Sequence, residues 1–157
     1  MDRLLDQART GPFYLCRPVL AEMVAAAIRY GTETLSQYEL HAYAVMPNHI
    51  HLLITPTILP FRLTQSLKSV TARRANEVLG LTGRPFWGEE SYDHMVRNQR
   101  EFEKIRAYIE QNPVRAGLVA AAEAYPWSSA APGDLGIASG PRVRPTVGPP
   151  SGAPGRT

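Results

Sequence analysis

The sequence predicts a single α+β domain built around an antiparallel sheet. Two segments that alternate apolar and polar residues, 38–46 and 49–55, are joined by the short turn Met46-Pro47-Asn48, as in a β-hairpin. Three segments with helical periodicity surround this hairpin: 18–30, 61–79 and 99–111. Helices that alternate irregularly with strands favour an α+β fold over a parallel α/β fold.

Length and composition suit one globular domain with a tail. The chain has 157 residues, of which 44% are hydrophobic and 20% charged, so it can bury a core. It has no apolar run of about 20 residues and no basic-then-apolar start typical of a signal peptide. Its one cysteine, Cys16, excludes an internal disulfide framework and a cysteine-based zinc site. We therefore expect a cytoplasmic protein with no membrane partner.

Residues 131–157 differ in composition from the rest. Gly and Pro make up 12 of these 27 residues, and none is aromatic. We therefore expect a domain over 1–130 and a disordered tail over 131–157. The tail carries a charge of +2 out of a net +3, so the basic pI is weak evidence for nucleic-acid binding.

The N-terminal third predicts one helix. Leu4 to Ala8 is expected to form only a short helical turn, which Gly11-Pro12 breaks. Pro18 fits the first turn of the helix over 18–30, and Gly31 fits its end. Its buried stripe is expected to comprise Leu20, Val24, Ala27 and Ile28.

In each strand of the hairpin, alternate side chains are expected to point to opposite faces of the sheet. In the first strand we expect one face to hold Leu40, Ala42, Ala44 and Met46. In the second strand, one face holds Ile50, Leu52 and Ile54, and the other holds His49, His51, Leu53 and Thr55.

The C-terminal half predicts two helices separated by a short strand. The apolar side of the helix over 61–79 is expected to comprise Leu63, Leu67, Val70 and Val78, and Gly80 ends this helix. A strand over 91–97 follows a glycine-bounded loop. In the helix over 99–111 the inward residues are Phe102, Ile105 and Ile109, and Asn112-Pro113 is expected to stop the helix.

His49 and His51 form the first candidate site. Because a strand repeats every two residues, both side chains point to one face, about 7 Å apart along the strand. Two imidazoles placed in this way could hold one divalent ion. The alternative is a pair of partly exposed histidines on a polar sheet face. His41, on the same side, is a minor ligand candidate, whereas His94 is expected to be structural.

A polar stripe on the last helix forms the second candidate site. Steps of three and four residues place on one side Glu101, Lys104, Tyr108 and Asn112. A phenol is a plausible nucleophile where a cation stabilises its anion. The alternative is that Tyr108 is an amphipathic side chain at the edge of the core.

The helix over 61–79 is basic and forms the third candidate site. It carries Lys68, Arg73 and Arg74, and it precedes a loop with Phe86 and Trp87. Cations beside exposed aromatic rings suit single-stranded nucleic acid. The alternative is a solvated helix face and a loop anchored by its aromatic residues.

Several of these segments together resemble a known family, the REP-associated tyrosine transposases, over roughly residues 10–130. These are single-tyrosine transposases with an HUH signature (His, hydrophobic residue, His) within the insertion-sequence transposase superfamily. The matching segments occur in the family's order and spacing: Tyr43-Ala44-Val45-Met46-Pro47-Asn48-His49-Ile50-His51-Leu52-Leu53, Pro85-Phe86-Trp87, Ser91-Tyr92-Asp93-His94, Tyr108-Ile109-Glu110-Gln111-Asn112-Pro113-Val114-Arg115-Ala116-Gly117-Leu118-Val119 and Tyr125-Pro126-Trp127-Ser128-Ser129.

The resemblance implies a fold and a chemistry. The fold is a ferredoxin-like sheet with helices on one face and a trailing helix that carries the tyrosine. Mg²⁺ or Mn²⁺ would be held by His49, His51 and Asn112. Tyr108 would attack the scissile phosphate, stay bonded to its 5′ side and free a 3′-OH. The substrate would be single-stranded or hairpin DNA. A homodimer is one form that the protein could take, but the sequence does not determine the oligomeric state. We expect its DNA contacts to include Lys68, Arg73, Arg74, Lys104 and Arg115.

One departure from the family leads to a further expectation. Members usually open with an inner strand before the first helix, and residues 1–16 are too short and too broken by proline to supply it. We therefore expect that strand to be missing, the edge of 49–55 to be unpaired, and the chain to be poorly soluble or oligomeric. Two other functions remain open. One is a DNA-hairpin binding protein that does not cut, and the other is a small metal phosphoesterase that uses an activated water.

Overall fold

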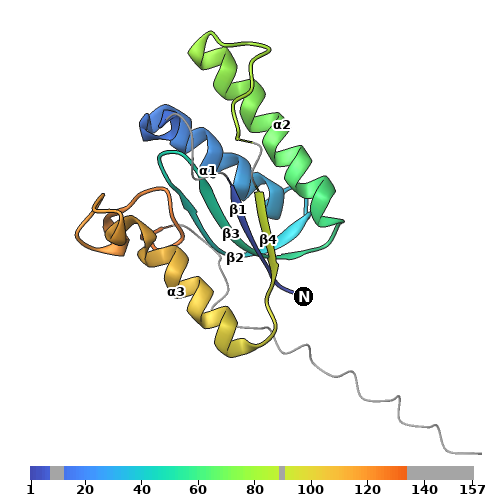
Figure 1. The fold of residues 1–157 in the computed structure, drawn as a ribbon, viewed down its shortest axis with the longest axis vertical. Helices are drawn as coiled ribbons and strands as arrows, with labels where there is room; N and C mark the ends of the chain where they lie inside the picture. Colours follow the sequence, from blue (N-terminus) through green and yellow to red (C-terminus); the bar gives the residue numbers. More distant parts are fainter. Residues whose placement is uncertain (8–12, 89–90, 134–157) are drawn as a thin grey trace, which may run out of the picture.

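A four-stranded antiparallel sheet forms the centre of the computed structural model, which describes residues 1–7, 13–88 and 91–133 (Figure 1). The expected tail lies almost wholly outside these residues. The strand order is β2-β3-β1-β4, and every neighbouring pair is antiparallel. The strands span Arg3–Gln7 (β1), Tyr38–Val45 (β2), Ile50–Pro56 (β3) and Ser91–Met95 (β4). The α+β prediction is confirmed.

The expectation that the first strand is missing is wrong. Strand β1 occupies the centre of the sheet, where Leu4 lies opposite Leu53 of β3 on one side and His94 of β4 on the other. Five residues suffice because partners on both sides satisfy the backbone of β1, and it ends well before Gly11-Pro12. Since β3 pairs with β1, the expected unpaired edge of β3 is absent, and the expectation of poor solubility loses its basis.

Two helices cover one face of the sheet, and a third covers the other (Figure 1). Helices α1 (Pro18–Glu33) and α2 (Pro60–Leu79) pack over Leu52 and Ile54, whereas α3 (Gln99–Arg115) packs over Leu53. The trailing helix is therefore on the opposite face from the other two. The part of the chain with a described structure contains no helix that is long and apolar enough to cross a membrane.

Helix α1 does not end at Gly31 as expected; it continues to Glu33. Gly31 instead allows the Tyr38 ring to approach the helix. A Cβ atom at Gly31 would lie 2.8 Å from Tyr38 Cε1, which is closer than carbon atoms can pack. The Tyr38 hydroxyl donates a hydrogen bond of 2.6 Å to the Ile28 carbonyl, and this contact ties β2 to α1. Burial raises the pKa of Tyr38.

Strand β2 contains a bulge that changes the predicted face of one residue. The register shifts between Leu40 and Ala42, so His41 is an extra residue in the ladder. Leu40 consequently joins Tyr43 on the α1 and α2 face, while Ala42 faces α3. The prediction that Leu40 and Ala42 share a face is wrong for this reason.

In α2, Gly80 ends the helix in the left-handed conformation, as predicted, with φ of 68°. The predicted apolar position Val78 is 54% exposed instead. Thr71 and Ala75, one turn apart, take the buried positions.

Helix α3 runs four residues beyond its predicted end at position 111, through Pro113 to Arg115. Proline lacks the N–H that would bond back to Ile109, but Pro113 is buried and its carbonyl accepts a hydrogen bond from Leu118 N at 3.0 Å. Burial and this bond compensate for the lost helix bond. Asn112 is therefore a helical residue, one turn after Tyr108.

A segment after α3 returns to cover the outer edge of β2. Ser129 N bonds to the Tyr43 carbonyl at 3.0 Å and Val45 N to the Trp127 carbonyl at 2.9 Å. The Tyr125 hydroxyl donates to the Val45 carbonyl at 2.6 Å, and burial raises its pKa to about 12. These contacts hold the end of β2 that leads into the Pro47-Asn48 turn.

Candidate active site

His49, directly before β3, and His51, within β3, lie side by side beneath α3. The turn before them is closed by Met46 N bonding to the His49 carbonyl at 2.8 Å, and Leu15 N bonds to the Pro47 carbonyl at 2.9 Å. The Nε2 atoms of His49 and His51 are 3.0 Å apart, and the two rings meet at 87°. His51 is fully buried, so the turn and the strand together determine the position of both rings.

This spacing fits a single divalent ion. Two neighbouring ligands of an octahedral ion at about 2.1 Å are about 3.0 Å apart, which matches the Nε2–Nε2 distance of 3.0 Å. Among residues 1–7, 13–88 and 91–133, no cluster of three or more His, Cys, Asp or Glu side chains could hold a metal. A third protein ligand from the described residues would therefore be of another type, such as an amide oxygen.

Asn48 contacts the histidine pair and was not singled out from the sequence. Its Oδ1 lies 2.7 Å from Nδ1 of His49. If Nδ1 of a neutral His49 donates this hydrogen bond, Nε2 carries the lone pair that a metal ion needs. The position of Asn48 directly before His49 could indicate a role at the histidine pair. Asparagine is common in turns, however, so the turn alone accounts for this residue in the sequence.

Tyr108 comes to the histidine pair from α3. Phe102 and Ile109 on the same helix are buried against the sheet, which leaves Tyr108 half-buried beside them. The centroids of the Tyr108 and His51 rings are 5.7 Å apart, with 76° between the ring planes. Through Tyr108, the polar stripe predicted for α3 therefore faces the histidine pair, which is the candidate metal site.

Arg115 lies over the ring of Tyr108. Its guanidinium carbon is 5.4 Å from the ring centroid, within the range of about 6 Å for a cation–π contact. The extension of α3 past Pro113 provides this position. Arg115, predicted as a DNA contact, is therefore also a neighbour of the candidate nucleophile.

Asn112 and Lys104 lie one turn after and one turn before Tyr108. The Asn112 side chain is half-buried and forms no hydrogen bond with any residue that the structure describes. Its amide is thus available for another ligand. Lys104 is exposed.

Glu101, the fourth residue of the stripe, has a structural role. Its carboxylate accepts hydrogen bonds from Arg97 N at 2.7 Å and from His94 Nε2 at 2.8 Å. The bond from the Arg97 backbone and the contact with His94 lower the pKa of Glu101. His94 is structural, as predicted, because it pairs with this carboxylate.

The structure separates the basic helix from the tyrosine. Lys68, Arg73 and Arg74 belong to α2, on the opposite face of the sheet from Tyr108. Burial lowers the pKa of Lys68. Phe86 stacks on Tyr14 at 5.7 Å, and Trp87 Nε1 donates to Thr71 Oγ1 at 2.8 Å. These aromatic side chains anchor the loop that follows α2. For this loop the structure supports the alternative interpretation, in which the aromatic residues hold the loop in place and do not bind nucleic acid.

His41 occupies the bulge of β2 on the α3 side. Its Nε2 is 2.7 Å from Thr55 Oγ1, and its ring packs edge-on against Phe102. Desolvation lowers its pKa. These contacts give His41 a packing role.

The family model and the two solved structures described below are all of transposases. The family model described as "Transposase IS200 like" matches residues 18–112. The structure of a REP-associated tyrosine transposase bound to a REP hairpin shares the fold, with a TM-score of 0.58 and 18% identity over 81% of this chain and 74% of that chain. A crystal structure assigned as a transposase of Deinococcus radiodurans R1 has a TM-score of 0.50 and 25% identity over 71% of this chain and 89% of that chain. No curated protein matches the sequence.

Proposed function

The chain belongs to the IS200-like transposase family, and we propose that it cuts and rejoins single-stranded DNA through a covalent bond to Tyr108. Family membership supports DNA transposition as the process. The observation that carries the cutting chemistry is the contact of Tyr108 with His51, 5.7 Å between ring centroids, beside a histidine pair spaced for one divalent ion.

The proposed reaction exchanges one phosphoester for another. The phenol oxygen of Tyr108 attacks the scissile phosphorus, and the bond from phosphorus to the 3′ oxygen breaks. The phenol proton goes to water or a nearby base, and the leaving 3′ oxygen takes up a proton. The 5′ phosphate stays on Tyr108. Because the phosphotyrosine bond retains the energy of the phosphodiester, the reverse attack by a 3′-OH rejoins DNA without ATP.

His49, His51 and Asn112 are the residues that would hold Mg²⁺ or Mn²⁺. When bound, such an ion polarises the phosphoryl oxygens and offsets the charge that develops in the transition state. Two imidazoles and one amide oxygen form a neutral ligand set. The availability of the Asn112 amide supports this role.

The cations near Tyr108 fit a DNA substrate. Arg115 lies over the phenol ring and Lys104 is exposed one turn away, so both can contact a phosphate that reaches Tyr108. The REP-associated transposase of known structure is bound to a REP hairpin. We propose single-stranded or hairpin DNA as the partner of this chain as well.

The test is a covalent adduct assay. Because the target sequence is unknown, the probe is a pool of DNA hairpins with randomised single-stranded flanks, labelled at either end, with Mn²⁺. We expect a protease-sensitive protein–DNA adduct that carries the 3′ label and releases the 5′-labelled fragment. Tyr108→Phe should bind the pool normally and form no adduct. Tyr14→Phe, on the other face of the sheet, is the matched control and should retain the adduct.

Each other outcome contradicts the proposal in a specific way. An adduct with Tyr108→Phe would mean that another residue is the nucleophile. Cleavage with no adduct would indicate a metal phosphoesterase with an activated water. Hairpin binding with neither cleavage nor adduct would indicate a binding protein.

A further inference from the structure

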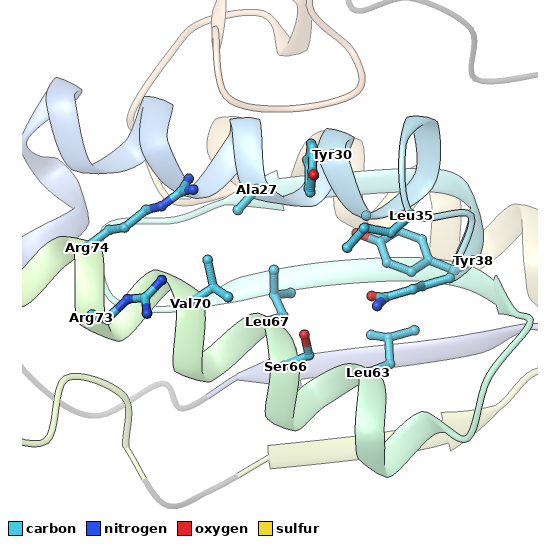
Figure 2. Close-up of a pocket in the computed structure, with 12 residues that line it drawn as sticks. Ala27, Tyr30, Leu35, Tyr38, Leu63, Ser66, Leu67, Val70, Arg73 and Arg74 are labelled. Carbon is cyan, nitrogen blue, oxygen red and sulfur yellow. The ribbon is translucent and has the colours of Figure 1, made fainter.

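A groove of about 160 Å³ runs between α1 and α2 (Figure 2). It lies on the opposite face of the sheet from Tyr108, so it is separate from the candidate active site. We propose that this groove binds one unpaired nucleotide of the DNA, with the base between the helices and its phosphate at Arg73 and Arg74. This inference rests on the proposed function, since it assigns a second DNA contact to the same protein.

The walls of the groove are mostly apolar and partly aromatic. Tyr30 comes from α1, Leu67 and Val70 come from α2, and Tyr38 comes from the start of β2 (Figure 2). Tyr30 is 54% exposed, so its ring is accessible from solvent. The volume of about 160 Å³ is well below the roughly 300–1,000 Å³ of sites for drug-sized ligands. The groove therefore suits a single ring system such as a base.

The two arginines give one end of the groove a strong positive charge. Figure 2 shows Arg73 and Arg74 at one end and Leu35 and Tyr38 at the other. Both arginines are exposed, and neither forms a salt bridge with a carboxylate of the described residues. By contrast, Arg29 on α1 pairs with Glu22 at 2.9 Å. A guanidinium fork without an internal carboxylate partner matches the geometry of a phosphate.

A nucleotide uses both parts of this groove. A purely apolar occupant, such as a peptide side chain, would leave the two guanidinium groups without a partner. A phosphate alone would not use the wall formed by Tyr30, Leu67 and Val70. Unpaired nucleotides carry a flat ring for an aromatic and apolar wall and a phosphate for arginine, which is how proteins commonly hold single strands.

The test compares oligonucleotides with and without bases. Fluorescent oligothymidylate and an abasic strand of equal length are titrated into the chain without metal, so that no cleavage occurs. We expect oligothymidylate to bind about 5- to 150-fold more tightly than the abasic strand, which is the gain that stacking of one base on a protein side chain commonly gives. Ser66→Trp, which fills the groove, should remove most of this difference. Ser69→Trp, at an exposed position of α2 that does not line the groove, should retain it.

A second measurement localises the base. Ultraviolet cross-linking of an oligonucleotide that contains 5-iododeoxyuridine should attach the base to the peptide with Tyr30. If Ser66→Trp fails to fold, this cross-link to the wild-type chain tests the groove site instead, and its absence overturns the proposal. Replacing Arg73 and Arg74 by Ala should also flatten the salt dependence, by about 0.7 in the slope of log K against log salt for the one phosphate that they hold.

The remaining outcomes separate this proposal from the proposed function. Equal binding of the two strands, or an unchanged preference in Ser66→Trp, overturns the groove site even if the Tyr108 adduct forms. Base-dependent binding that Ser66→Trp abolishes supports the groove site even if no adduct forms. Self-association that depends on Ser66 would show that a second copy of the chain occupies the groove, which also overturns the proposal.

Discussion

The ring of Tyr108 lies edge-on to the imidazole of His51, with 5.7 Å between centroids and 76° between planes. These residues belong to elements far apart in the chain, and packing brings them together. Ile109 and Leu53, their neighbours on α3 and β3, are both completely buried in the same cluster. Because the burial of Ile109 and Leu53 in one cluster packs α3 against the sheet, the phenol of Tyr108 is held beside the histidine pair before any substrate binds.

We expect the histidine pair to be required for metal binding. The double variant His49→Ala, His51→Ala should show no measurable Mn²⁺ binding by calorimetric titration, because both imidazole ligands are lost. Asn112→Ala should weaken binding less. His94→Gln, which alters a histidine outside the pair, is the control. Unchanged Mn²⁺ affinity in the folded double variant would disprove the metal site.

We expect Asn48 to tune that site through His49. Asn48→Ala removes the oxygen that lies 2.7 Å from Nδ1 and should lower Mn²⁺ affinity about 10- to 100-fold, as loss of such an outer partner commonly does. Asn48→Asp keeps an oxygen acceptor and should largely preserve affinity. If the two variants bind Mn²⁺ equally well, the orienting role of Asn48 is wrong.

Gly31→Ala should lower the free energy of unfolding by about 1–3 kcal/mol, a common cost of overpacking. The added Cβ would overlap the Tyr38 ring. Urea denaturation measures this loss. In a Tyr38→Phe background the extra cost should be smaller, because the hydroxyl oxygen is the atom nearest to the new methyl group. A full, unchanged cost in that background would show that the ring carbons, which remain in phenylalanine, cause the overlap and that the hydroxyl does not.

Glu101 should stabilise the fold in a pH-dependent way. Its pKa is lowered in the folded protein, so its stabilising effect is complete above the ordinary value of 4.5 and is lost as the pH falls through the folded value. The melting temperature of Glu101→Gln should therefore lie below that of the wild type at about pH 6, and the gap should close towards about pH 3. Glu103→Gln, on the same helix, is the control. A gap that stays constant across this range would contradict the assignment.

Much of the fold and the candidate site follows from local periodicity. The alternation along 49–55 places His49 and His51 on one face, and the helical spacing around Tyr108 places it beside, and not within, the buried stripe of Phe102 and Ile109. Both conclusions depend on side-chain directions within one element, which the repeat of a strand or a helix determines.

Long-range contacts account for the errors. Local sequence does not predict strand β1, because its five residues give too short a pattern and its stability comes from β3 and β4 on both sides. The prediction that α1 ends at Gly31 is wrong because this glycine makes room for Tyr38, which belongs to β2. The extension of α3 past Pro113 depends on burial that no local signal indicates.

Residue types and local spacing identify the candidate site residues: two histidines on one strand face, a tyrosine on a polar helix stripe, and arginines on a basic helix. Which of them lie close together depends on how the helices and strands pack. This packing brings Tyr108 and Arg115 together and places Tyr108 against His51, whereas the sheet separates Arg73 and Arg74 from them. The reason is that the face of the sheet on which a helix packs depends on the path of the whole chain, which the pattern within the helix does not contain.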